Sequence, residues 1–153
     1  MDFGGRYLFS ATRAAVWAAL NDTSVLKAVI PGCESIAWTS ERTLEVTIKV
    51  RLGFVHPVFG GELELSNVLP AERYTLSGRG RGALGMAQGA ADIELEAVDG
   101  GTLLSFSAAG RADGGIMRLG KALIGRSAQK VIDGFFESIG RQMGVEVAPL
   151  PPQ

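Results

Sequence analysis

Residues 16–34 read VWAALNDTSVLKAVIPGCE, and this stretch decides how the chain folds. Its apolar residues recur at helical spacing up to Leu20, and Asn21-Asp22 then ends a first short helix. A second short apolar turn runs through Val25-Leu26, and Pro31-Gly32 forms a corner that leads into a strand. A pair of short helices inserted after a first strand is expected to close one end of a curved sheet.

Alternating apolar and polar residues predict strands on both sides of this stretch. Residues 3–9 alternate at the amino end, and residues 44–52 form the cleanest half-buried strand pattern in the chain. Further alternating segments follow at residues 59–65, 74–78, 91–96 and 104–108. The Asp99-Gly100-Gly101 segment is typical of a hairpin turn, because glycine tolerates a positive φ. Consecutive short strands with tight turns predict a curved antiparallel sheet of about six to seven strands.

From Gly115 to about Met143 the hydrophobic period becomes that of a helix. Its apolar side carries Met117, Ile124, Ala128, Val131, Phe135 and Ile139. Its opposite side carries Arg126, Lys130, Asp133, Glu137 and Arg141. A helix of this length can cross a whole sheet, so the pattern predicts an α+β helix-grip fold whose curved sheet wraps around a long carboxyl-terminal helix. Residues 1–145 are expected to form a single domain, and the Pro-rich residues 146–153 a flexible tail.

The composition excludes several classes of protein. The chain has 153 residues, of which 46% are hydrophobic and 20% charged, which fits one ordinary globular domain. Its formal net charge of −1 gives no basic field for binding nucleic acid. The single cysteine, Cys33, cannot form an internal disulfide, which fits a reducing compartment. We see no signal peptide and no transmembrane stretch, so a cytoplasmic location is expected.

The sequence gives little support to catalysis. The only histidine, His56, lies beside Pro57 in a predicted turn, where it is more often solvated than catalytic. Cys33 would need a base to act as a nucleophile, so we interpret it as a structural thiol. No spacing of histidine, cysteine or acidic residues predicts a metal site. The G-x-G-x-G run at residues 78–82 lacks the strand–turn–helix context of a nucleotide site and is better read as a bending strand.

A cavity between the sheet and the long helix is a better candidate than a catalytic site. The sheet has many glycines where a packed core would carry valine or isoleucine, and such small residues leave space that either collapses or holds a ligand. The alternative is that the same apolar residues form an ordinary core. Tyr74 and Ser127 are candidates for orienting a polar head group at the mouth of the cavity. The predicted lining consists of Phe59, Leu63, Tyr74, Leu84, Met86, Phe106, Met117, Ile124, Ala128, Val131 and Phe135.

The start of the long helix carries a second candidate surface. Leu119 and Leu123 lie off the predicted sheet-facing side, among the cations Arg118, Lys121 and Arg126. An apolar stripe flanked by cations can contact an anionic membrane or a partner protein. In the alternative interpretation, loops cover the leucines and the cations are simply solvated.

Several short motifs of the chain resemble those of one known family. The motifs are V-W-x-x-L-N-D, V-L-K and I-P-G-C-E within residues 16–34, then Tyr74-Thr75-Leu76-Ser77-Gly78 with Gly80, Gly89-Ala90-Ala91-Asp92 and Gly101-Thr102-Leu103-Leu104, and finally Leu119-Gly120 and Phe135-Phe136. In this order they resemble the G-subunit family of carbon monoxide dehydrogenase, within the START-like helix-grip (SRPBCC) superfamily of proteins that bind hydrophobic ligands. The resemblance covers roughly residues 2 to 140.

The resemblance implies a non-enzymatic accessory protein of a molybdenum hydroxylase of the carbon monoxide dehydrogenase type. It implies a non-covalent quinone or lipid ligand, no covalently bound cofactor, and a link between the enzyme and the inner face of the cytoplasmic membrane. Some relatives carry a further apolar carboxyl-terminal segment, whereas this chain ends at Gln153, which favours a peripheral or shuttle role. Two alternatives remain open: a pure docking module with a filled core, and a cyclase or hydratase on the same fold.

Overall fold

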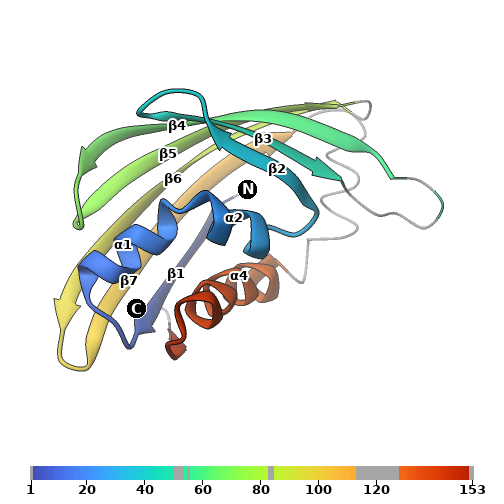
Figure 1. Cartoon of the computed structure of the whole chain (residues 1–153). Helices are drawn as coiled ribbons and strands as arrows, with labels where there is room; N and C mark the ends of the chain where they lie inside the picture. Colours follow the sequence, from blue (N-terminus) through green and yellow to red (C-terminus); the bar gives the residue numbers. More distant parts are fainter. Residues whose placement is uncertain (1, 50–53, 55, 83–84, 113–127, 152–153) are drawn as a thin grey trace.

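A computed structural model describes residues 2–49, 54, 56–82, 85–112 and 128–151. Within these residues, eight strands form one antiparallel sheet in the order β2-β3-β4-β5-β6-β7-β1-β8, and the sheet arches over the helices (Figure 1). The strands are β1 Asp2–Phe9, β2 Cys33–Trp38, β3 Thr43–Lys49, β4 Val58–Leu69, β5 Arg73–Gly82, β6 Gly85–Val98, β7 Gly101–Ala112 and β8 Val147–Leu150. The helices are α1 Arg13–Leu20, α2 Thr23–Val29 and α4 Ala128–Met143. The predicted α+β helix-grip fold is confirmed.

The helix pair after β1 is set by its caps and by one glycine. The Thr12 hydroxyl accepts a hydrogen bond from the first turn of α1 at 3.2 Å, and the Asp22 carboxylate accepts two from the first turn of α2 at 2.8 and 3.4 Å. Gly32 follows α2 with a φ of +75°, and a Cβ there would collide with the Lys49 carbonyl oxygen. The corner therefore needs glycine, both for its left-handed backbone and for its close contact with β3.

The packed core occupies the end of the sheet that the helices cover. The hydroxyl of Thr102 is buried there and donates a hydrogen bond to the Ala11 carbonyl at 2.7 Å, so the buried polar group is satisfied. Three aromatic rings meet beside it: Phe136 of α4 lies 4.5 Å from the ring of Tyr7 and 5.3 Å from that of Phe106. The fully buried side chains are Tyr7, Phe9, Val16, Thr102, Leu104 and Ile139.

The buried face of α4 differs from the predicted one. Phe136, Ile139 and Gly140 are buried, whereas Val131 is 46% exposed and Phe135 only half-buried. The sequence has two adjacent apolar pairs, Val131-Ile132 and Phe135-Phe136, and either member of each pair could face the core. Packing against β1 and β7 selects the second member, which turns the helix away from the predicted side. Residues 115–127 of the predicted helix lie outside the described residues.

The carboxyl-terminal segment is not the loose tail that we expected. Residues Val147–Leu150 form β8 and pair with Arg6–Phe9 of β1, and the Ser10 amide donates to the Glu146 carbonyl at 3.0 Å. The proline at position 149 misled the sequence interpretation. An edge strand tolerates proline, because one side of its backbone has no partner strand. This strand also accounts for the difference between the expected six or seven strands and the observed eight.

The contact between α4 and β8 predicts opposite effects at two glycines of the same helix. A Cβ on Gly140 would collide with the Val147 side chain, whereas a Cβ on Gly134 meets nothing within 4 Å. We expect Gly140→Ala to lower the free energy of unfolding by about 1–3 kcal/mol through overpacking. Gly134→Ala should raise it by roughly 0.5–1 kcal/mol through helix propensity. Urea unfolding of both variants measures the difference.

The double variant Gly140→Ala, Val147→Ala serves as the control, because it removes the side chain that the new methyl group would meet. Its stability should exceed that of Gly140→Ala. If Gly140→Ala and Gly134→Ala stabilise the protein equally, β8 does not pack on α4 as described.

Candidate functional site

The concave face of the sheet holds an apolar cup away from the packed core. Its volume is about 430 Å³, and it extends from β3 across β4, β5, β6 and β7 to Phe3 of β1. Strand register places glycine or alanine at almost every inward position of the floor, and larger apolar side chains form the walls. The floor residues are Gly61, Gly78, Gly80, Ala87, Gly89, Ala91, Ala108 and Gly110. The wall residues are Phe3, Val46, Ile48, Phe59, Leu63 and Leu76.

The floor glycines are not equivalent. A Cβ on Gly61 would lie 2.8 Å from the Arg79 carbonyl oxygen, and one on Gly89 would lie 3.0 Å from that of Ala109. These two glycines let neighbouring backbones come close where the sheet bends. Gly80 is different, since a Cβ there would meet nothing nearer than 3.8 Å. The cup above Gly80 therefore has room for atoms that the described side chains do not supply.

The residues predicted to line a cavity fall into three groups. Phe59 and Leu63 line the cup, while Tyr74, 6% exposed, and Phe106 lie in the packed core beside it. Met86 is 41% exposed on the outer face, because the parity that points Ala91, Ile93 and Leu95 inward holds along the whole of β6. No described residue of α4 lines the cup, and Val131 and Phe135 lie elsewhere on the helix. The predicted Leu84, Met117, Ile124 and Ser127 lie outside the described residues, as do Leu119, Leu123, Arg118, Lys121 and Arg126 of the second surface; of Ala128 only the backbone is described.

A polar cluster between β1 and α4 escaped the sequence analysis. The Tyr7 hydroxyl donates to Asp133 Oδ1 at 2.6 Å, and Gln129 Nε2 donates to Tyr7 Oη at 3.2 Å and to Asp133 Oδ1 at 2.9 Å. Asp133 was assigned to the solvated side of the helix, but the turn of α4 described above makes it half-buried. The inward parity of Phe3, Gly5 and Tyr7 was the available signal for Tyr7. We call Tyr7, Gln129 and Asp133 the polar triad.

The polar triad borders a cavity of its own. This cavity has a volume of about 620 Å³ and lies between β1, β8 and the first turns of α4. Glycine at position 5 keeps the space beside Tyr7 open, since a Cβ there would lie 3.0 Å from the Tyr7 hydroxyl and 3.2 Å from the Phe106 ring. The lining residues are Gly4, Gly5, Arg6, Tyr7, Gln129, Asp133, Pro149 and Leu150.

Both tyrosines of the chain sit in environments that oppose ionisation. Burial, the hydrogen bond to Asp133 and the charge of that carboxylate raise the pKa of Tyr7 well above its ordinary value. Tyr7 itself is only 1% exposed. Burial alone raises the pKa of Tyr74, whose ring packs edge-on against Trp17 at 5.2 Å. Both phenols are therefore held neutral and are suited to hydrogen bonding rather than to base catalysis.

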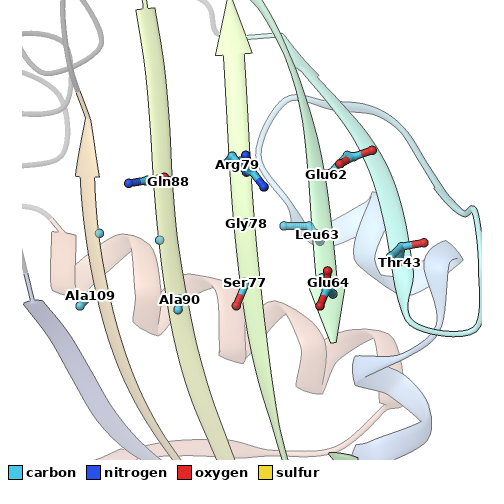
Figure 2. Close-up of a pocket in the computed structure, with 12 residues that line it drawn as sticks. Thr43, Glu62, Leu63, Glu64, Ser77, Gly78, Arg79, Gln88, Ala90 and Ala109 are labelled. Carbon is cyan, nitrogen blue, oxygen red and sulfur yellow. The ribbon is translucent and has the colours of Figure 1, made fainter. Parts of the chain in front are cut away.

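The outer face of the sheet carries a separate, charged depression. It has a volume of about 600 Å³, and Figure 2 shows its side chains on the side of the strands that faces away from α4. Register places Glu62 of β4 opposite Arg79 of β5, and Arg79 opposite Gln88 of β6. Charges of both signs alternate across this surface, which does not match the apolar ligand expected from the sequence.

The residues weighed for catalysis are placed without partners for that chemistry. The Cys33 thiol is half-buried and lies 3.5 Å from the Ser35 carbonyl, and burial raises the pKa of the thiol. His56 is exposed. Among the described residues, no group of three or more histidine, cysteine or acidic side chains is placed to hold a metal ion. None of the helices in those parts of the chain has the length and hydropathy that crossing a bilayer requires.

The two buried phenols predict a specific alkaline instability. Above about pH 10 the unfolded chain loses its tyrosine protons, while the folded protein retains them. The unfolded state then binds fewer protons, so the free energy of unfolding should fall as pH rises from about 10 towards the raised folded-state pKa values. Tyrosinate absorbance, followed together with circular dichroism, tests this. We expect tyrosinate to form only as the fold is lost, because the chain has only two tyrosines. Tyrosinate formation near pH 10 in the folded protein would contradict it.

The fold is shared with solved proteins of low sequence identity. A conserved protein from Geobacillus kaustophilus superposes with a TM-score of 0.83 at 22% identity, over 96% of this chain and 99% of its own. A protein from Chromobacterium violaceum gives a TM-score of 0.72 at 17% identity, over 93% and 96%. An uncharacterised protein from Rhizobium leguminosarum gives 0.69 at 14%, over 92% and 95%. At these identities the likeness shows the fold alone.

A comparison with curated proteins finds no match to this chain. The model of one protein family does match, and the match covers residues 5–144, which include the cup and the polar triad. That family is described as the G-subunit of carbon monoxide dehydrogenase, abbreviated CoxG, and the motifs quoted above from residues 16–34 onward lie within the matched range. The chain belongs to the CoxG family of carbon monoxide dehydrogenase.

Proposed function

We propose that this protein is a non-enzymatic accessory of a molybdenum hydroxylase of the carbon monoxide dehydrogenase type and that it binds an apolar quinone or lipid in the cup. The observation that carries the proposal is the floor of glycine and alanine, which leaves about 430 Å³ above a sheet face walled by apolar side chains. Ligand pockets commonly measure roughly 300–1,000 Å³ and are mostly apolar with a few polar groups. The cup fits that description.

The driving force for such binding is desolvation. Each buried CH₂ of an isoprenoid or acyl chain contributes about 0.8 kcal/mol, so a short apolar tail suffices for micromolar affinity. Phe59, Leu63 and Leu76 offer such a tail a continuous apolar wall. An enzyme of this kind passes electrons to quinones in the membrane. A protein that carries the quinone between the cytoplasmic face of the membrane and the enzyme would link the two without being permanently anchored.

Filling the cup should abolish binding. Gly80→Leu places a side chain where a Cβ has free space over the floor, so the variant should fold and lose affinity for decylubiquinone at least about tenfold. Gly60→Leu is the matched control. Gly60 also has nothing within 4 Å of an added Cβ, and strand parity points its side chain to the outer face. Isothermal titration calorimetry with decylubiquinone, after circular dichroism of both variants, measures the effect.

The two leucine variants also separate the proposal from its alternatives. Equal affinity of Gly80→Leu and Gly60→Leu would show that the cup is not the binding site. No saturable binding by the wild-type protein, together with an empty solvent extract of the purified protein by mass spectrometry, would favour a docking module. Turnover of a bound compound that His56→Ala abolishes would favour an enzyme.

A further inference from the structure

We propose that the polar triad of Tyr7, Gln129 and Asp133 is a head-group site that selects a ligand whose head donates hydrogen bonds, and so favours a hydroquinone over the corresponding quinone. The inference rests on the proposed function, because it identifies the polar end of the same ligand. It arises from a count of which atoms of the triad are already engaged.

All donors of the triad are used within it. The Tyr7 hydroxyl gives its one proton to Asp133 Oδ1, and the two protons of Gln129 Nε2 go to Tyr7 Oη and Asp133 Oδ1. Asp133 Oδ2 and Gln129 Oε1 accept no hydrogen bond from the described residues. The cluster therefore offers its cavity hydrogen-bond acceptors. A quinone carbonyl can only accept, whereas a hydroquinone hydroxyl can donate.

Arg6 is the remaining polar side chain at this cavity and does not alter the count. Strand alternation puts it on the face of β1 opposite Tyr7, and its Nη2 donates to the Pro151 carbonyl at 2.9 Å. Its Nε is buried without a hydrogen-bond partner. The inward side of the cavity is therefore left to Tyr7, Gln129 and Asp133.

The triad and the cup are placed for one ligand to occupy both. Phe3 lines the cup and Gly5 lines the triad cavity, and they are successive inward positions of β1, about 7 Å apart along the strand. Gly5 has no side chain to separate the two spaces. A head group bound at Asp133 can thus be continuous with a tail that runs along the floor towards Gly80.

The preference has a consequence for the direction of transport. A reaction that reduces a bound quinone yields the hydroquinone, which is the form that the triad holds more tightly. Retention of the reduced form by this protein would remove product from the enzyme and return it towards the membrane. The protein would then act in the step that follows quinone reduction.

The test compares decylubiquinone with decylubiquinol, reduced beforehand and kept anaerobic, by isothermal titration calorimetry. Wild-type protein should bind the quinol at least about tenfold more tightly, as expected for a hydrogen bond to a charged acceptor. Asp133→Asn should bring the two affinities to within about threefold of each other. Glu137→Gln, one turn further along α4, removes the same charge outside the triad and should keep the preference.

A second variant guards against a folding defect in Asp133→Asn. Gln129 is exposed, so Gln129→Met should fold and still lower the preference at least about threefold. Equal binding of quinone and quinol by the wild type would overturn this inference and leave the proposed function standing. A preference that both triad variants retain would overturn it as well. Absence of binding of either form would instead overturn the proposed function.

Discussion

The close approach of backbones across β4, β5, β6 and β7 is the constraint on which the rest of this structure depends. A Cβ on Gly61 or Gly89 would press on a carbonyl of the neighbouring strand, so these positions accept no larger residue without local movement. The sheet can therefore bend, and its inner face in this region lacks the side chains that fill an ordinary core. Curvature and cavity have one cause, which is the stripe of small residues.

The other half of the concave face is built on the opposite principle. There Tyr7, Leu104 and Ile139 are buried, and α1, α2 and α4 cover the strands. This packed half supplies the stability that the hollow half lacks, since burial of large apolar side chains is the main favourable term in folding. Tyr7 stands where the two halves meet. Its ring belongs to the core, and its hydroxyl belongs to the triad cavity.

Much of this arrangement could be predicted from local patterns. The paired short helices, the alternating strands and a long carboxyl-terminal helix follow from periodicity and turn chemistry, and the family match agrees with the motifs. Phe59 and Leu63 were assigned to a cavity from alternation alone, and both line the cup. Met86 was misplaced because strand parity was not carried through β6, and β8 was missed because proline was taken to exclude a strand.

The amino-acid sequence by itself determined the fold class, since a period of two or of 3.6 residues decides which side of an element is apolar. It also determined where small residues would line the sheet. Only the tertiary structure decided which of two adjacent apolar stripes on α4 faces the core, because Val131-Ile132 and Phe135-Phe136 satisfy the helical period equally well. That rotation brings Asp133 to 2.6 Å from a tyrosine 126 residues earlier in the chain, a contact that no local pattern encodes.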